Sequence, residues 1–599
     1  MKKKITKLIL TACIVVISAT TSFSQISDLN NGSECGCPPV GSRTTVDLAT
    51  LAVALDANQV EIQANTTLTC DKIYTFDKKV YVANGVTLTI QPGTVLKGAY
   101  VATATHAAAI IVERGGKIIA DGKPNGKIIM TGMADPLDGT YSVTNVGDWG
   151  GLVICGFASN NLLTAYNYGA GKKGSPWNGV GYIEGADNTV KTLWGAGDTI
   201  NGVPTVINDN DNSGILRYVS VRHAGALLSG NTAGNELNGI SLYSVGRGTK
   251  IDYCEVVSAA DDAFELFGGN VDLKHCSVLY SDDDYFDYDL GWTGRMQFCF
   301  GIAGDSLTGV HSTDNGFEAD ADDNGSCTTF DRSHPLVYNT TLISNGHMVP
   351  AADNTGAAAI MAKELTEGEF VNNVFVNFRS GLHLATSRST TGNGKAGDAY
   401  DNWTDHGSVY INPNYPTGSG YGATQNAKLQ SLKVKNNTFV RCNQGTSNNP
   451  NGYSYWITKG TMTTSASPNY LYKDATAASA ADTTQFFNDG NIHSASVPGI
   501  DYAWSWNTGH TDLTNKYHAV PSTSLTSTMT PPNDGFFDIV AFRGAFDPTK
   551  ASWLSTENGF MVPVADKINS DNPTDLNNDG ITNIDDFSIF IGKFGQLDQ

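Results

Sequence analysis

A short apolar motif recurs through the middle of the chain. An apolar residue is followed, after two intervening positions, by Cys, Asn or Val, and after one more by an apolar or β-branched residue. The copies are Leu216-x-x-Val219-x-Val221, Ile251-x-x-Cys254-x-Val256, Leu273-x-x-Cys276-x-Val278, Leu336-x-x-Asn339-x-Thr341, Phe370-x-x-Asn373-x-Phe375 and Val434-x-x-Asn437-x-Phe439. The cysteines Cys254, Cys276 and Cys299 are spaced by 22 and 23 residues, which indicates a structural repeat.

This interval is about one turn of a three-sided coil made of short strands and turns. In such a solenoid each strand stacks on its equivalent one turn earlier, about 4.8 Å away. A helical solenoid needs amphipathic runs of about ten residues or more, and a β-propeller needs antiparallel hairpins; the sequence offers almost no such runs and no regular hairpins. We therefore predict an all-β fold, a right-handed parallel β-helix, with Cys254, Cys276 and Cys299 stacked on one face as free thiols.

The repeat divides the chain into segments. We expect a signal peptide at 1–24, an N-terminal segment or cap at 25–70, the β-helix with long loop insertions at 71–467, degenerate turns and a cap at 468–568, and a calcium repeat at 569–599. The insertions are the polar, non-periodic stretches Tyr166–Asn212 and Ser387–Lys428. We expect Gly535–Trp553 to close the coil, because an open end would expose an unpaired strand edge.

A second pattern brings carboxylates onto adjacent turns. The form [Asp/Asn]-x-Phe-[Glu/Asp] recurs at Asp262–Glu265, Asp284–Asp287 and Asn315–Glu318, with spacings of 22 and 31 residues. Equivalent carboxylates ~4.8 Å apart would repel by about 3 to 4 kcal/mol per pair at an effective dielectric constant near 20. Such a cluster persists only if it is solvated, partly protonated or bridged by a cation.

The bridging alternative gives a specific chemical hypothesis. Ca²⁺ would join Asp262, Asp284 and Asp287 and orient an acidic sugar, with Arg295 or Arg217 as the base of a lyase. An inverting hydrolase is also possible, since two carboxylates ~6.5–9.5 Å apart can serve as acid and base. Tyr285, Tyr288 and Trp292 would stack on sugar rings, although aromatic side chains at strand spacing more often fill the core.

The C-terminus carries a calcium-loop motif. Asp575, Asn577 and Asp579 offer side-chain oxygens at positions 1, 3 and 5, Gly580 permits the sharp turn, and the Ile581 carbonyl, Asn583 and Asp586 follow. The alternative is a polar tail that only looks like a loop. Phe587–Phe594 then predicts a short amphipathic helix. The segment resembles one half of a type I dockerin, but a full dockerin has two such loops, so cohesin binding is not expected.

A weaker match to the same loop lies between two turns of the predicted coil. It consists of Asp320, Asp322, Asn324 and Asp331, and no helix follows it. Its oxygen ligands suit Ca²⁺. A polar surface loop is the equally weighted alternative.

The N-terminus indicates export. Lys2, Lys3, Lys4 and Lys7 precede an apolar run, and small residues precede Gln25, which predicts cleavage after residue 24. Leu10–Cys13 offers a competing lipoprotein signal. No other stretch has the ~20 apolar residues of a spanning helix, so we expect an extracellular or outer-surface location. In that compartment Cys70 can form a disulfide with Cys35 or Cys37.

Several motifs resemble one group of proteins. They are Asp148–Ile154, Asn238–Ile240, Asp261–Gly269 and Phe542–Pro548. They are similar to motifs of exported β-helix proteins of Bacteroidota, in the pectate-lyase-like superfamily. That resemblance implies fold and location and carries no activity.

The expected function is therefore that of a calcium-stabilised surface β-helix that binds a glycan or another surface partner without catalysis. A polysaccharide lyase or glycoside hydrolase is the alternative from a different class. The formal net charge of −21 argues against nucleic acid as a partner.

Overall fold

The computed structural model describes most of the predicted coil and part of the C-terminal segment beyond it. The described residues are 27–101, 106–162, 179–186, 188–226, 228, 237–304, 313–321, 332–346, 358–363, 366–389, 432–442, 457–463, 476–477, 480–494, 496–502, 504, 517–554 and 564–565. The predicted signal peptide and the calcium repeat at 569–599 lie outside these residues. In the part that is described, none of the helices combines the length and the hydropathy needed to cross a membrane.

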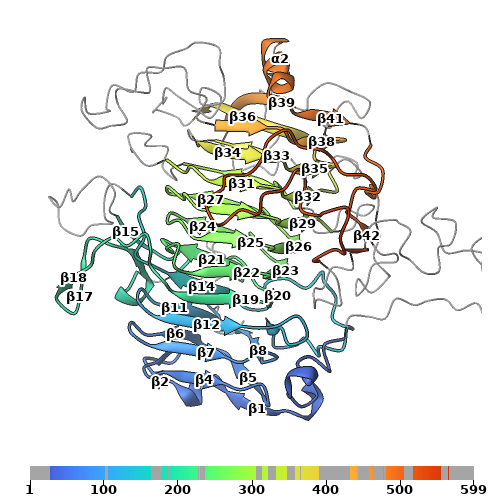
Figure 1. Ribbon diagram of the computed structural model, residues 1–599. Helices are drawn as coiled ribbons and strands as arrows, with labels where there is room; N and C mark the ends of the chain where they lie inside the picture. The colour runs from blue at the N-terminus through green and yellow to red at the C-terminus, as the bar shows by residue number, and fades with distance from the viewer. Residues whose placement is uncertain are drawn as a thin grey trace, which may run out of the picture.

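Three long sheets, named A, B and C here, wind around one core (Figure 1). Sheet A stacks β1 (Thr44–Asp47), β5 (Lys72–Phe76), β8 (Val95–Gly98), β13 (Ile128–Gly132), β20 (Val219–Arg222), β23 (Glu255–Ala259), β26 (Ser277–Ser281), β29 (Phe300–Ile302), β32 (Thr341–Ile343), β35 (Val374–Val376), β38 (Thr438–Val440) and β41 (Ile492–Ser494).

Sheet B stacks β2 (Val53–Ala54), β3 (Gln59–Ile62), β6 (Lys79–Val82), β11 (Ala109–Val112), β14 (Gly151–Cys155), β21 (Ile240–Tyr243), β24 (Phe264–Phe267), β27 (Phe286–Asp289), β30 (Phe317–Ala319), β33 (Ala358–Ala362), β36 (Ser380–Ser389), β39 (Ile457–Thr463) and β40 (Thr476–Ala477). Sheet C stacks β4 (Thr66–Leu68), β7 (Thr87–Ile90), β12 (Lys117–Asp121), β19 (Gly214–Arg217), β22 (Lys250–Asp252), β25 (Asp272–Lys274), β28 (Arg295–Gln297), β31 (Leu336–Tyr338), β34 (Gly368–Val371) and β37 (Leu432–Lys435).

Smaller elements lie outside the coil. They are the strand pairs β9 (Tyr100–Val101) with β10 (His106–Ala107), β15 (Val180–Tyr182) with β16 (Leu193–Gly195), β17 (Thr199–Ile200) with β18 (Val203–Pro204) and β42 (Tyr517–His518) with β43 (Val564–Ala565), the helix α2 (Ala480–Asn488), and the 3-10 turns η1 (Ser33–Cys35), η2 (Val40–Ser42), η3 (Leu48–Leu51) and η4 (Val190–Thr192).

The pairing within the three long sheets is that of a parallel solenoid. Neighbouring strands run parallel, except that β2 pairs antiparallel with β3 and β40 pairs antiparallel with β39. Each complete coil contributes one strand to each sheet, so the three sheets grow together along the stack. This confirms the predicted all-β class and is consistent with a right-handed parallel β-helix.

The predicted cysteine column is confirmed. Cys254, Cys276 and Cys299 directly precede β23, β26 and β29, whose registers align Glu255 with Ser277 and Ser277 with Phe300. All three thiols are free and fully buried. They therefore form a ladder inside the coil, with no disulfide between them.

The same column continues with polar side chains in the later coils. Thr340 Oγ1 donates to Asn373 Oδ1 at 2.9 Å, Asn373 Nδ2 to Asn437 Oδ1 at 3.0 Å, and Asn437 Nδ2 to Asn491 Oδ1 at 3.2 Å. All four residues are buried. Buried amides need such partners, because an orphaned donor or acceptor costs about 1–3 kcal/mol.

One copy of the predicted motif is out of phase. Met296 pairs with Val337, so the motif in that coil is Val337-x-x-Thr340-x-Leu342 and begins one residue after Leu336. Asn339 has a φ of 54° and makes the bend between sheets C and A. Asn is one of the few non-glycine residues that adopt this left-handed conformation readily. The Asn of the predicted motif is therefore the bend residue, and Thr340 is the residue that belongs to the column.

The coil begins earlier than expected. β3 and β4 already belong to stacked coils, so the boundary predicted at residue 71 is too late. The N-terminal segment is tied to them by the disulfide Cys37–Cys70, which confirms Cys70 as the partner of one of the two nearby cysteines. Cys35 remains a free thiol.

The C-terminal segment lies elsewhere than expected. Gly535–Trp553 was expected to cap the coil, but Arg543 Nη1 donates to Asn437 O at 2.9 Å and Phe546 packs on Phe300 at 5.5 Å between ring centroids. The segment, drawn in red in Figure 1, thus runs along the side of the coil. The end of the coil carries α2 instead. Phe486 of α2 packs against Phe439 in the core, with 5.3 Å between the ring centroids.

Candidate functional site

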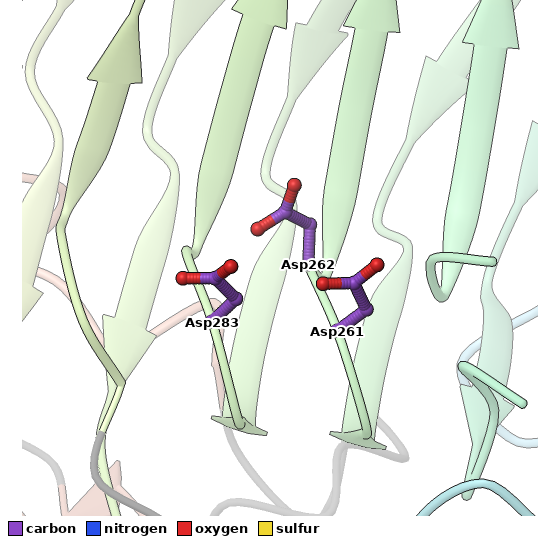
Figure 2. A group of neighbouring side chains, drawn as sticks. All are labelled: Asp261, Asp262 and Asp283. Carbon is purple, nitrogen blue, oxygen red and sulfur yellow. The ribbon is translucent and has the colours of Figure 1, made fainter. Parts of the chain in front are cut away.

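The carboxylates gather at one corner of the coil, where sheet A turns into sheet B. The connection 260–263 joins β23 to β24, and the connection 282–285 joins β26 to β27 one coil later. Figure 2 shows Asp261 and Asp262 on the first connection and Asp283 beside them on the second. We name this region the acidic corner; it comprises Asp261, Asp262, Glu265, Asp283, Asp284, Asp287 and Asp314.

A ladder of side-chain oxygens runs through the acidic corner. Asn238 Oδ1 accepts the backbone N–H of Asp262 at 3.2 Å, and Asp262 Oδ1 accepts that of Asp284 at 2.7 Å. Asp284 Oδ1 accepts that of Asn315 at 2.5 Å, and Asn315 Oδ1 accepts that of Ala358 at 3.1 Å. Each side chain therefore accepts a backbone N–H of the next coil.

The ladder itself does not need a carboxylate. Asn238 and Asn315 perform the same hydrogen bonding on the coils before and after Asp262 and Asp284. An uncharged amide would avoid the cost of burying a charge, yet Asp262 and Asp284 are only 6% and 1% exposed. The ladder bond alone therefore does not account for an ionisable carboxyl group at these two positions.

The carboxylate oxygens are close enough to share ions. Three groups each have one oxygen per residue within 4.8 Å of the others; they are Asp261, Asp262 and Asp283; Asp262, Glu265 and Asp287; and Asp283, Asp284 and Asp314. Ca²⁺ binds oxygen at about 2.4 Å, so two of its ligand atoms are at most about 4.8 Å apart. The spacing of each group is thus compatible with one calcium coordination sphere.

Burial and mutual repulsion favour the protonated form of these groups. Burial, with the nearby charges of Asp287 and Asp283, raises the pKa of Asp262 well above its usual range. Burial, and then the charges of Glu184 and Asp287, raises the pKa of Glu265 in the same way. Burial also raises the pKa of Asp284 to about 6. A bound cation would reverse this preference, because it stabilises the ionised form.

One carboxylate oxygen of Asp287 has no hydrogen-bond partner. Its Oδ1 is buried and accepts no hydrogen bond. Burial raises the pKa of Asp287 well above its usual range, although the charge of Lys363 opposes the rise. Lys363 itself lies 2.9 Å from Asp320 and also pairs with Glu318. A buried anionic oxygen without a donor is a suitable ligand for a cation.

The three predicted sugar-stacking side chains belong to the core, so that expectation is wrong for them. Tyr285, Tyr288 and Trp292 are fully buried. The Tyr285 hydroxyl donates to Ile343 O at 2.7 Å, and Trp292 Nε1 donates to Val271 O at 3.2 Å. Their polar atoms are satisfied inside the protein, and their rings face other core side chains.

The predicted base lies on a different face. Arg295 is in β28 of sheet C, where its guanidinium binds Asp272 and, at 2.7 Å, Asp534. Arg217, also on sheet C, pairs with Asp121 at 2.6 Å. Neither arginine faces the acidic corner on sheet B, so the sequence-based combination of these bases with Asp262, Asp284 and Asp287 is wrong.

The predicted calcium loops fall almost entirely outside the described residues. This holds for Asp575, Asn577, Asp579, Ile581, Asn583 and Asp586, and for Asp322, Asn324 and Asp331. Asp320 is described, is buried, and pairs with Lys363. Both loops remain predictions.

The structure adds residues to the sequence-based set. Glu265 was not named as a ligand, although the fourth position of its motif places it in register with Asp287. Asp314 precedes Asn315 of the same motif in the next coil. Both could have been found by treating every acidic residue within or beside the repeated motif as one column. Two further acidic residues of these coils, Asp282 and Asp289, belong to none of the three groups of neighbouring carboxylates.

Comparison with protein families gives one match. The model of the pectate-lyase-like β-helix domain matches residues 60–461. Comparisons with curated proteins and with solved structures gave no match. The matched segment runs from β3 into β39, covers more than half of the chain, and contains the whole acidic corner. With its three parallel sheets and this match, the chain belongs to the pectate-lyase-like β-helix family.

Proposed function

We propose that this chain is an extracellular or outer-surface β-helix protein that holds Ca²⁺ at the acidic corner and binds a glycan or another surface partner without catalysis. The observation that carries the calcium part is the replacement of Asn by Asp at two buried rungs of an otherwise amide ladder. An Asp at a rung of the ladder adds a negative charge, and burying that charge away from water costs free energy. A cation is the partner that would offset both.

The geometry of one group supports calcium in particular. Asp262, Glu265 and Asp287 combine oxygens within 4.8 Å of one another with the donor-less Oδ1 of Asp287. Carboxylate oxygens are hard ligands, and Ca²⁺ tolerates irregular coordination better than Mg²⁺ does. An ion held at this corner would present its remaining coordination positions to hydroxyl or carboxylate oxygens of a glycan.

Non-catalytic binding is preferred because the described part of the corner offers no arginine or lysine that is placed to act as the base of a lyase. Arg295 and Arg217 lie on sheet C, and the ammonium of Lys363 is engaged by Glu318 and Asp320. Asp284, whose raised pKa of about 6 would suit a general acid, is 1% exposed and already serves as a ladder rung. Proton transfer to a substrate requires contact, which this burial opposes.

The proposed location rests on the predicted signal peptide and the disulfide. Disulfides form and persist mainly outside the cytoplasm, and Cys37–Cys70 links the N-terminal segment to the first coils. An exported location would also place the protein where millimolar Ca²⁺ is common enough to fill weak sites.

The experiment is a calcium titration followed by a glycan array with a parallel product assay. Calorimetry of the mature chain is compared with Asp287→Asn and with Glu369→Gln. Glu369→Gln is the matched control, because it also removes one carboxylate but does so on sheet C, where Glu369 pairs with Lys433 and Tyr338. We expect Asp287→Asn to lose one calcium site and Glu369→Gln to keep it.

On the array, we expect glycan binding that chelator removes and no shortened products. Product release would favour the lyase or hydrolase alternative. Equal calcium binding by Asp287→Asn and the unsubstituted protein would contradict the proposed site.

A further inference from the structure

The long connection between β13 and β14, called the β13–β14 loop here, lies beside the acidic corner. The backbone N–H groups of Gly147 in this loop and of Ala260 both donate to Ala224 O, each at 3.0 Å. Asp148 of the loop and Asp261 of the acidic corner directly follow these two donors in the chain. The β13–β14 loop is therefore an immediate neighbour of the acidic corner.

Hydrogen bonds from the coil hold the β13–β14 loop in place. Ser258 Oγ donates to Val143 O at 2.5 Å, and His223 Nδ1 lies 2.6 Å from Asn145 O. Val143 is 1% exposed and belongs to the main core. These contacts fix the backbone of the loop, so its side chains are presented in a defined arrangement.

Tyr141 and Asp148 form a pair of side chains on this loop. The Tyr141 hydroxyl donates to Asp148 Oδ2 at 2.7 Å, and both residues are partly exposed. Within the described part of the chain, Asp148 Oδ1 accepts no hydrogen bond, and the one ring contact of Tyr141 is a perpendicular contact with His223 at 4.8 Å between centroids. One carboxylate oxygen and part of an aromatic ring are therefore accessible to a ligand.

The glycine at position 132 leaves room for this pair. A Cβ atom at Gly132 would lie 2.7 Å from Asp148 Cβ and 2.9 Å from the carboxyl carbon of Asp148. The φ of Gly132 is not in the left-handed region, so the need for glycine here is steric. A side chain at this position would displace the Asp148 carboxylate from the Tyr141 hydroxyl.

An aromatic ring beside a carboxylate is suited to a sugar. One face of a pyranose ring carries C–H groups that pack on an aromatic ring, and the sugar hydroxyl groups can donate to a carboxylate. A neutral sugar suits this pair better than an acidic one, because Asp148 and Asp261 would repel a sugar carboxylate. The three carboxylates of the proposed calcium site also exceed the charge of one Ca²⁺, so the region stays negative with calcium bound.

We propose that Tyr141 and Asp148 form a subsite for a neutral pyranose sugar, whose ring packs on Tyr141 and whose hydroxyl group donates to Asp148 Oδ1. This inference rests on the proposed calcium-dependent glycan binding and names the class of glycan. Tyr141 supplies the sugar contact that Tyr285, Tyr288 and Trp292, which are buried, do not. The calcium ion and the subsite hold neighbouring parts of one oligosaccharide, so chelation removes one of the two contacts on which binding depends.

The test uses the full mature chain with Asp575→Ala and Asp579→Ala, so that the predicted C-terminal loop takes up no calcium. The probe is an array of oligosaccharides built either from neutral hexoses or from uronic acids, read with excess Ca²⁺ and with chelator. Calcium affinity and melting temperature are measured for each variant beside the array. We expect calcium-dependent binding of the neutral oligosaccharides.

Three substitutions in the subsite and one control locate the sugar. Tyr141→Leu should weaken the binding of neutral oligosaccharides about tenfold, the scale of an aromatic contact, and leave the calcium affinity unchanged. Tyr141→Phe keeps the ring and should bind within about threefold of the parent. Asp148→Asn keeps an acceptor for the Tyr141 hydroxyl but should bind about threefold more weakly, because the charge-assisted hydrogen bond is lost. Tyr218→Leu should bind like the parent; Tyr218 is also partly exposed but stacks on Tyr253 at 4.8 Å, at the bend between sheets C and A.

The subsite is overturned if folded Tyr141→Leu binds both Ca²⁺ and neutral oligosaccharides as tightly as the parent; the calcium site is then unaffected. It is also overturned if calcium affinity falls in parallel with sugar binding, which would give Tyr141 a structural role, or if only the uronic-acid oligosaccharides bind. If Tyr141→Leu does not fold, Asp148→Asn decides, and unchanged sugar binding by that variant overturns the subsite. A parent that binds Ca²⁺ but none of the oligosaccharides contradicts the glycan part of the proposed function, and the subsite with it.

Discussion

Replacing Asp284 by Asn would show whether the acidic corner exists to hold a cation. Asn315 occupies the same rung one coil later and accepts the Ala358 amide at 3.1 Å, so an amide side chain fits this position. The substitution keeps an oxygen for the Asn315 N–H, which Asp284 Oδ1 accepts at 2.5 Å. It removes the charge and the second acceptor, Oδ2, to which Asn315 Nδ2 donates at 3.4 Å.

The size of the effect can be worked out from the pKa of Asp284. Burial raises that pKa from 3.8 to about 6, and each unit corresponds to about 1.36 kcal/mol. Since the folded pKa lies above the unfolded one, the folded state binds the proton more tightly. The ionised group therefore destabilises the fold by about 3 kcal/mol above pH 6, and this cost disappears as the pH falls below about 4.

Without a cation, Asp284→Asn should thus be more stable than the parent by up to about 3 kcal/mol at pH 8 and equal to it near pH 3.5. Calcium should change the difference in stability between the two proteins. An ion at a hundredfold its dissociation constant stabilises the parent by about 2.7 kcal/mol, and the variant should gain less because a charge next to the site is lost. The two proteins should then become nearly equal in stability, or change order.

The assay is urea unfolding followed by tryptophan fluorescence, at both pH values, with chelator or with excess Ca²⁺. Both proteins carry Asp575→Ala and Asp579→Ala. Asp282→Asn is the matched control, because Asp282 is exposed and belongs to none of the three cation groups; it should shift stability by no more than about 0.5 kcal/mol. A variant that is less stable than the parent in chelator at pH 8 would refute the reasoning.

Three other results are expected. Asn437→Ala removes the acceptor of the Asn373 N–H and the donor to Phe370 O, both at 2.8 Å, and should lower the free energy of unfolding by about 1–3 kcal/mol in urea; an unchanged value would contradict the buried ladder. Tyr285→Phe removes the hydrogen bond to Ile343 O and should cost about 1 kcal/mol without altering glycan binding on the array. Asp575→Ala with Asp579→Ala should lower the calorimetric calcium stoichiometry by one, and unchanged stoichiometry would disprove the C-terminal loop.

Columns of stacked side chains could be predicted from the sequence because a solenoid converts spacing along the chain into neighbourhood in space. Cys254 and Cys276 are one coil apart, and so are Phe264 and Phe286, whose rings stack at 5.5 Å. The same reasoning brought Asp262 and Asp284 together. The disulfide partner Cys70 was predicted separately, from the oxidising compartment, and that argument left the choice between Cys35 and Cys37 open.

Which residue of a coil occupies each position of the repeated motif was harder to predict, because the bends between strands vary in length and conformation. The shift at Leu336 arose where Asn339 takes a left-handed conformation at the bend. Inward and outward directions near a corner were equally undetermined. Tyr285 follows a turn and points into the core, against the alternation that holds within a regular strand.

Contacts between segments far apart along the chain were decided only by the tertiary structure. The position of Arg295 on sheet C fixes its distance from the acidic corner, and its partner Asp534 comes from the C-terminal segment. The Glu184 N–H donates to the Tyr243 hydroxyl on sheet B because its insertion docks on the coil through Trp194. Repetition determines which residues stack along the coil, whereas the packing of non-repeating segments depends on shape and burial that spacing does not encode.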